Sequence, residues 1–334
     1  MKQIENSIVK DEEFVESLIE NRSICQVGLD LKYTIDTEFL TVGMPSIGQV
    51  GVDYSPRQVI IMKKKEMQAQ TKATKAMIRP IANIALKIEK KISACGGGVT
   101  GCTLLPHGTI AFANEKKRNI IVVKYDGSLD FHIDLNPYAP FDITYIPNTN
   151  AITVTSKSSK DIKIVDINAR GVLKTYCLDS PCAGISYSEN KIILCSLEKG
   201  ILELNQHDGS VKTIVSDKMD SFSHVACLGN KIYYTKSHNQ SVICCDLQGN
   251  IQWTFKNPTM TYPIGVSVDT DGNVYVAFHY SRNVVVISSD GQQHKQMLSS
   301  KDGVYIPNGL IYDRHNNQLL VTNYSKGAVL YNVT

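Results

Sequence analysis

The chain has 334 residues, of which 43% are hydrophobic and 20% charged, and its formal net charge is +3 at pH 7. These values are typical of a globular protein. No apolar run approaches the roughly 18 residues that a membrane span requires, so the sequence predicts no transmembrane helix.

Charge is unevenly distributed along the chain. Residues 1–60 carry five Lys/Arg and ten Asp/Glu, residues 61–91 carry nine and two, and the remainder is nearly neutral. The positive total therefore comes from residues 61–91. Net charge gives no argument for nucleic-acid binding by the rest of the chain.

The first residues and the cysteines indicate the compartment. Residues 1–13 are mostly polar and lack the apolar core of a signal peptide. The nine cysteines lack the spacing of a secreted disulfide framework. We therefore expect a cytoplasmic protein.

Residues 1–30 are expected to contain a short helix. Ile4, Ile8, Val15 and Leu18 recur at helical spacing with acidic residues between them, which predicts an amphipathic helix. Ile8 and Val15 are also one heptad apart, so the end of a coiled coil that pairs with a second chain is the alternative.

Residues 31–83 are expected to be irregular. Glycines and prolines break up residues 39–61 and indicate turns and short strands. Residues 62–79 are lysine-rich and poor in apolar side chains, which predicts a solvated linker, with a basic targeting or binding run as the alternative.

The stretch around residues 264–298 predicts one β-sheet unit. Three segments rich in β-branched and aromatic residues, Ile264–Val268, Asn273–Phe278 and Asn283–Ser288, are followed by a weaker one, Gln293–Leu298. Asp290-Gly291 is typical of a hairpin turn, because glycine accepts a positive φ at little cost. The unit is therefore four short strands.

This unit recurs about six times. Small or polar residues mark the first strand of each copy at intervals of roughly 40 to 44 residues, at Gly101, Asp142, Gly184, His224, Gly265 and Gly309. A period in that range, with four strands per unit, is typical of a β-propeller. We predict an all-β fold, a six-bladed β-propeller over residues 84–334.

The sixth copy lacks one strand. Gln318–Asn323 and Ala328–Asn332 supply two strands before the chain ends at Thr334. Ile84–Glu89 alternates correctly and is expected to complete the sixth sheet as a strand near residues 84–91, which removes an exposed edge.

Three segments resemble NHL repeats of the tripartite-motif (TRIM) family: Val99–Ile110, Asp269–Ala277 and Ile306–Ile311. The resemblance covers roughly residues 84–334 and implies an NHL-type propeller that selects a partner. The RING and B-box modules of that family need repeated Cys-x₂-Cys pairs, and this sequence has none. Ubiquitin-ligase activity would therefore require a partner chain.

Neither the cysteines nor the histidines form a recognisable catalytic pattern. Cys95 and Cys102 flank a triglycine turn, and Cys244 and Cys245 are expected to face opposite sides of one strand. Buried free cysteines are the simplest interpretation. We expect no cofactor and no metal.

One enzymatic alternative remains. Six-bladed propellers include SMP-30-like calcium-dependent lactonases, which hold a metal with oxygen ligands on the propeller axis. The corresponding positions here are Asp142, His224 and Asn308, a thin shell for a hard cation.

The loops between the second and third strands of the copies are candidate binding elements. They share one face of a propeller with the loops that link blades, and they hold nine Lys/Arg against three acidic residues. The candidate binding residues are Lys116, Lys117, Arg118, Lys157, Lys160, Lys199, Lys236, His238, His279, Tyr280, Arg282, Tyr324 and Lys326. Positive charge with aromatic rings suits single-stranded RNA, positive charge alone suits an acidic protein partner, and solvated loops also carry lysines without any ligand.

Together these features predict a non-catalytic recognition module that binds a protein partner through this face. Single-stranded RNA is the first alternative ligand, and a calcium-dependent lactonase is the second alternative.

Overall fold

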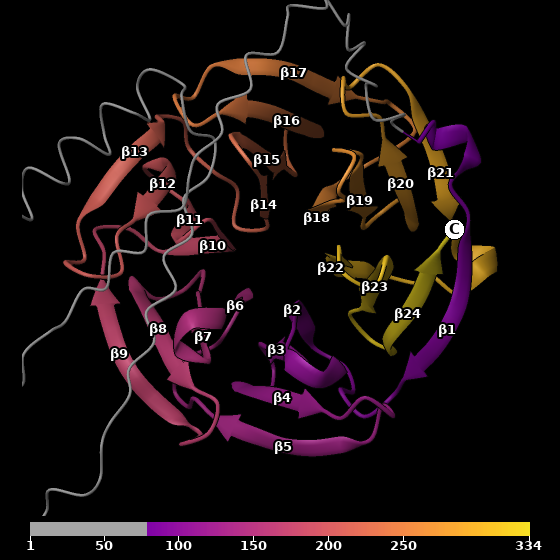
Figure 1. Cartoon of the computed structure of the whole chain (residues 1–334). Coiled ribbons are helices and arrows are strands. Elements are labelled where there is room, and N and C mark those ends of the chain that lie inside the picture. The colour runs from indigo at the N-terminus through magenta and orange to yellow at the C-terminus, as the bar shows by residue number, and fades with distance from the viewer. Residues whose placement is uncertain (1–78) are drawn as a thin grey trace, which may run out of the picture. The chain divides into compact units, whose positions relative to one another are not determined.

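The computed structural model describes residues 79–334, which form six four-stranded antiparallel sheets arranged around a central axis (Figure 1). The all-β six-bladed propeller is thus confirmed. The predicted helix within residues 1–30, and residues 31–78 of the predicted irregular segment, lie outside the described residues. Residues 79–334 contain no α-helix, only four 3₁₀ turns: η2 (Ile81–Asn83), η3 (Pro106–Gly108), η4 (Pro147–Thr149) and η5 (Ser300–Asp302).

Each blade places its first strand nearest the axis and its fourth on the rim (Figure 1). The innermost strands are β2 (Val99–Leu104), β6 (Ile143–Ile146), β10 (Cys182–Ser188), β14 (Val225–Leu228), β18 (Pro263–Val268) and β22 (Pro307–Asp313). The second strands are β3 (Ile110–Asn114), β7 (Ala151–Val154), β11 (Lys191–Ser196), β15 (Lys231–Lys236), β19 (Val274–Phe278) and β23 (Gln318–Asn323).

The third strands are β4 (Asn119–Val123), β8 (Asp161–Asp166), β12 (Gly200–Leu204), β16 (Ser241–Asp246), β20 (Asn283–Ile287) and β24 (Gly327–Val333). The rim strands are β5 (Leu129–Asp134), β9 (Gly171–Cys177), β13 (Val211–Val215), β17 (Ile251–Lys256), β21 (His294–Leu298) and β1 (Leu86–Ile92).

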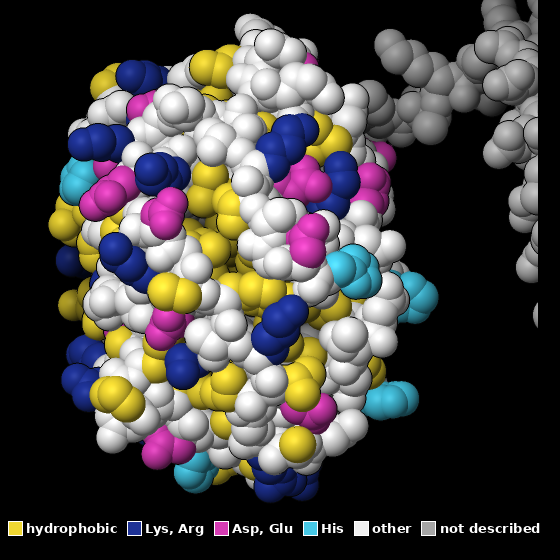
Figure 2. Space-filling model, turned by 90° about the vertical axis from the view of Figure 1, so that its left-hand side faces the viewer, with side chains coloured by type: hydrophobic (Ala, Val, Ile, Leu, Met, Phe, Trp, Pro, Cys, Tyr) yellow, Lys and Arg dark blue, Asp and Glu magenta, His cyan; other side chains and the backbone are white. Residues whose placement is uncertain are grey.

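Burial explains why the middle strands read as apolar runs. All five residues of β19 and all five of β20 are buried, because each sheet packs against a neighbouring blade on both faces. The rim strand β21 alternates in exposure instead, since one of its faces meets solvent. Figure 2 shows one side of the rim, where basic and acidic side chains are interspersed.

The chain closes its ring through its last blade. β1 pairs with β24, so this sheet has the order β1-β24-β23-β22. Beyond the last register pair, Ala85 and Thr334 exchange two backbone hydrogen bonds of 2.7 and 3.0 Å. A strand from the start of the described chain thus completes the blade built from its end (Figure 1).

The core is divided among the interfaces between blades. Six apolar clusters join residues of adjacent sheets; one of them joins Ile92 of β1, Phe112 of β3 and Leu330 of β24. No helix among residues 79–334 is long and apolar enough to cross a membrane.

The antiparallel strands give the propeller two distinct faces. The loop face carries the loops between second and third strands together with the loops that link blades. The opposite face carries the remaining turns, including the turn after β22 that holds Arg314.

Candidate functional site

Aromatic side chains gather on the loop face. Phe141, Phe222, Tyr262, His279 and Tyr280, the aromatic cluster, follow one another with ring centroids 4.4 to 6.1 Å apart. Phe141, Phe222 and Tyr262 lie in loops that link blades, whereas His279 and Tyr280 lie in the loop between β19 and β20. Residues from different blades therefore form one surface.

The outer end of the aromatic cluster is accessible. Tyr280 is 66% exposed and its ring lies 4.4 Å from that of Tyr262 at an interplanar angle of 35°. His279 packs beside both rings, and its Nδ1 is buried without a hydrogen-bond partner among the described residues. Burial lowers the pKa of His279 below its usual value. The cluster thus presents an exposed tyrosine ring that packs on partly buried aromatic side chains.

Cations lie over aromatic rings around the cluster. Lys157 Nζ is 4.3 Å from the ring centroid of Phe222, and Arg282 and Lys326 each lie 4.9 Å from that of Tyr305. Lys116 lies 5.0 Å from the ring of Tyr324 in the same manner. Cation–π contacts of this kind order long side chains that would otherwise be mobile.

The loop face is less basic than its second-to-third-strand loops alone suggest. Lys157 pairs with Glu115 at 2.9 Å, and His238 Nδ1 lies 2.8 Å from Asp220. Lys236 is buried and pairs with Asp217 at 2.6 Å, so its charge is not presented to a ligand. Asp217 and Asp220 lie in the loop that links β13 to β14, outside the loops from which the basic face was predicted.

The other predicted binding residues are dispersed around the rim of the loop face. Lys117, Lys160 and Lys199 make no ion pair with any residue in the described part of the chain. Arg118 donates from Nη1 to Asn136 Oδ1 at 3.1 Å. These side chains add positive charge at separate places and form no single patch with the aromatic cluster.

Sequence reasoning missed the aromatic residues of the linking loops. Tyr262 directly precedes β18, Phe141 and Tyr305 lie two residues before the first residues of β6 and β22, and Phe222 lies three residues before that of β14. Aligning the repeats on their innermost strands would have shown this recurrence. Aromatic residues had been considered as binding residues only in the loops between second and third strands.

A second candidate site lies on the axis. Polar residues at the start of the innermost strands of alternate blades, Asp142 and His224, pack against glycines of the blades before them, Gly101 and Gly184. A Cβ on Gly184 would lie 2.5 Å from His224 Cα. The small residues thus make room for polar side chains to meet near the axis.

Asp142 and His224 form a buried pair. His224 Nδ1 lies 3.3 Å from Asp142 Oδ2, and both side chains are buried. The backbone N–H groups of Ile143 and Ile185 each donate to Asp142 at 2.9 Å, one to each carboxylate oxygen. His224 Nε2 has no hydrogen-bond partner among the described residues.

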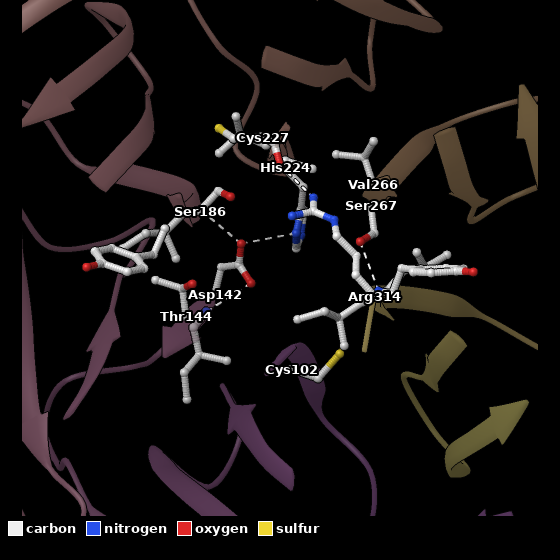
Figure 3. Close-up of a pocket in the computed structure, with 17 residues that line it drawn as sticks. Cys102, Asp142, Thr144, Ser186, His224, Cys227, Val266, Ser267 and Arg314 are labelled. Atoms are coloured by element: carbon white, nitrogen blue, oxygen red, sulfur yellow. Dashed lines mark hydrogen bonds and ion pairs between the residues drawn. The ribbon is translucent and has the colours of Figure 1, made fainter. Parts of the chain in front are cut away.

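A cavity of about 130 Å³ on the axis is lined by this pair and by residues from all six blades, among them Cys102, Ser186, Ser267 and Arg314. Figure 3 shows Asp142 and His224 directed toward each other and the Arg314 side chain extending from β22 toward the centre. Arg314 donates to the carbonyl oxygens of Cys227 at 2.6 Å and Val268 at 3.1 Å. It therefore bridges three blades.

The axial residues do not fit a hard cation. Both oxygens of Asp142 already accept backbone hydrogen bonds, and Asn308 and His224 add only neutral ligands to a single carboxylate. Residues 79–334 contain no group of three or more His, Cys, Asp or Glu side chains placed to hold a metal. A calcium centre like that of the lactonases has no support in this geometry.

The described cysteines are free, and Cys177 alone among them is exposed. Cys244 and Cys245 belong to different apolar clusters, so their side chains face opposite sides of β16 as predicted. Burial raises the pKa of Cys244 to about 11 and that of Cys245 to about 12. Both therefore remain thiols at neutral pH.

No protein-family model and no curated protein matches the sequence. The fold is similar to several solved structures. Virginiamycin B lyase from Staphylococcus aureus is 17% identical with a TM-score of 0.53, over 75% of this chain and 88% of that one.

Two further similar structures have different functions. An aldose sugar dehydrogenase from Streptomyces coelicolor, solved with PQQ, is 10% identical with a TM-score of 0.62, over 76% of this chain and 99% of that one. A chain of a nidogen/laminin complex is 10% identical with a TM-score of 0.57, over 65% and 85%. At such identities these likenesses establish the propeller fold alone.

Proposed function

We propose that this chain is a non-catalytic recognition module that binds an acidic protein segment through the loop face. The observation that supports this proposal is the aromatic cluster, an exposed tyrosine on packed rings. Aromatic anchors surrounded by polar groups are typical of energetically important interface residues. The partner is an acidic segment because Lys117, Lys160 and Lys199 have no acidic partner among the described residues.

The NHL resemblance agrees with a recognition role, and the protein complex of the nidogen/laminin neighbour shows a similar fold engaged with a partner. We propose a TRIM-NHL-like module that acts in the cytoplasm, where the free cysteines of the described chain would stay reduced. Any link to ubiquitin transfer then depends on a second protein.

Protein is favoured over RNA because several loop-face charges are already paired. Lys157 and Lys236 are matched by Glu115 and Asp217. Binding of nucleic acid depends on releasing counterions through unpaired cations. A charge-mixed face with a central aromatic anchor suits a polypeptide better.

The test is selection of a random peptide library displayed on phage against the full chain. We expect enriched peptides to combine Asp or Glu with an aromatic or aliphatic anchor. Tyr280→Ala should weaken binding of the enriched peptides by about tenfold or more. Tyr125→Ala is the matched control, since Tyr125 is similarly exposed but lies in the β4–β5 turn on the opposite face.

A random single-stranded RNA pool at about 50 and 200 mM salt is the parallel experiment. We expect no saturable binding. Saturable, salt-sensitive RNA binding that is lost on changing Lys116, Lys117 and Arg118 to Glu would replace the protein proposal. Peptide binding that is insensitive to Tyr280→Ala would contradict the placement of the site on the aromatic cluster.

A further inference from the structure

The axial cavity has no part in the proposed recognition function, and its chemistry is distinct. Arg314 is exposed as a residue, but its guanidinium lines the cavity, is part-buried there and makes hydrogen bonds only to backbone carbonyls within the described chain. Burial lowers the pKa of Arg314, although an arginine remains charged under all ordinary conditions. A partly desolvated cation without a bonded carboxylate favours an anion beside it.

Other groups in the cavity wall also act as hydrogen-bond donors. Ser267 Oγ accepts the backbone N–H of Tyr312 at 2.9 Å, which leaves the hydroxyl hydrogen free to donate into the cavity. Thr144 and Ser186 contribute two further hydroxyl groups to the lining. Hydroxyl groups that can donate to an anion therefore line the cavity together with Arg314.

His224 supplies the complementary group. Asp142 is held by two backbone N–H groups, and its Oδ2 lies 3.3 Å from His224 Nδ1. We therefore assign the imidazole hydrogen to Nδ1, which leaves Nε2 as an acceptor. His224 is only 4% exposed, and its Nε2 lacks a partner in the described chain. An unpaired buried acceptor is costly, so this atom calls for a donor from a ligand in the cavity.

The volume of the axial cavity restricts the size of the ligand. A cavity of about 130 Å³ compares with the roughly 150 Å³ that accommodates benzene.

We propose that the axial cavity binds a small hydroxylated anion of about six to eight heavy atoms, a carboxylate or a phosphate monoester. Its anionic group binds Arg314 and the hydroxyl of Ser267, and its own hydroxyl donates to His224 Nε2. This site is independent of the loop face, so either proposal can fail while the other stands.

Isothermal titration calorimetry on the full chain tests this proposal with four probes. These are 3-hydroxypropionate, propionate, 2-hydroxyethyl phosphate and ethyl phosphate, at constant ionic strength with chloride as the balancing anion. We expect at least one hydroxylated probe to bind with one-to-one stoichiometry, and about tenfold or more tighter than its partner without the hydroxyl. The two pairs distinguish a carboxylate ligand from a phosphate ligand.

Two variants locate the site. Arg314→Gln should weaken binding of the hydroxylated probe by about tenfold or more, whereas Arg170→Gln, in the β8–β9 turn on the same face and stacked on Phe131, should leave it unchanged. His224→Gln should reduce the preference for the hydroxylated probe while binding of the anion persists. The ratio of the affinities of His224→Gln for the two probes tests the proposal even if Arg314→Gln fails to fold.

Two results would overturn the proposal. One is the absence of binding by all four probes at about 10 mM, where even a weak site of this kind would be occupied. The other is binding whose strength and hydroxyl preference are the same in wild type, Arg314→Gln and His224→Gln.

Discussion

Threonines at the ends of second strands, together with glycines of the innermost strands, show how single residues build the axis. Thr155 Oγ1 and Thr235 Oγ1 accept the backbone N–H groups of Asp142 at 3.2 Å and His224 at 2.9 Å. Both threonines also donate to a carbonyl of the next blade, Thr155 to Ala183 and Thr235 to Ile264. Alternate blades therefore hold their polar axial residue by the same device, with a glycine of the preceding blade beside it.

Gly184→Ala is expected to destabilise the protein. The added Cβ would collide with the backbone of His224, which the surrounding strands prevent from moving. We expect the free energy of unfolding, measured by urea denaturation, to fall by about 1–3 kcal/mol.

Gly171→Ala is the control for this substitution. Gly171 lies at the start of β9, and the nearest atom to its added Cβ is 3.8 Å away. This variant should be unchanged or up to about 1 kcal/mol more stable. An equally stable Gly184→Ala protein would show that the blades do not approach as closely as described.

His279 is expected to make stability depend on pH. Burial lowers its folded-state pKa, so the unfolded chain binds a proton at higher pH than the folded chain does. Stability contributed by the neutral imidazole is therefore lost as the pH falls below about 6.5, the unfolded value. Urea denaturation at pH 7 and pH 5 should show a smaller loss for His279→Gln than for wild type.

The exposed His315 offers the matched substitution. His315→Gln should retain the wild-type loss of stability between pH 7 and pH 5. If His279→Gln and wild type lose equal stability over this range, the imidazole of His279 is not held neutral by burial.

At the scale of elements, the rim strand β1 closes the ring through its apolar side. Ile92 is 1% exposed and packs in a cluster with Phe112 and Leu330, whereas Ile88 of the same strand is 48% exposed. Ile92→Ala should lower the free energy of unfolding by about 2–5 kcal/mol, because it leaves a cavity between two blades. Ile88→Ala removes the same atoms from an exposed position of the same strand. It should change the free energy of unfolding by only about 0.5 kcal/mol.

Chemical denaturation of the two variants measures this difference directly. Similar losses for Ile92→Ala and Ile88→Ala would mean that β1 does not seal the blade interface.

The elements were predictable from sequence because strand signals are local. The predicted strand Gln318–Asn323 coincides with β23, and the predicted Asn283–Ser288 differs from β20 by one residue. The aromatic cluster was not predictable in the same way, because Phe141 and Tyr262 are far apart in sequence and come to lie on either side of Phe222 only when the blades close. The pairing of Lys236 was not predictable for the same reason, because its partner Asp217 lies in the loop that links β13 to β14.

The axial site was also only partly predictable from the sequence. Asp142, His224 and Asn308 were identified from the repeat and compared with a calcium shell. The sequence did not reveal that backbone N–H groups occupy both oxygens of Asp142. Arg314 lies beyond the innermost strand and carries no repeat signal of its own, so its reach across three blades appears only in the folded ring.

At the scale of the whole molecule, closure makes the blades depend on one another. Trp253 is the single tryptophan, and its Nε1 donates at 3.1 Å from blade β14–β17 to Ser289 of the next blade. Ile92 lies at a different interface, between β1-β24-β23-β22 and β2–β5. An open stack of repeats would let these two interfaces unfold separately, whereas a closed ring has no free end from which to fray.

We therefore expect Ile92→Ala to shift the denaturation of the whole propeller as one transition. Trp253 fluorescence and far-UV circular dichroism should give the same lowered midpoint, with a single transition in each. Trp253→Phe serves as the control for the probe, because its circular dichroism midpoint shows how much the indole hydrogen bond itself contributes. If the Trp253 midpoint stayed at its wild-type value while the circular dichroism midpoint fell, the blade closed by β1 would unfold independently, and the ring would not be the cooperative unit.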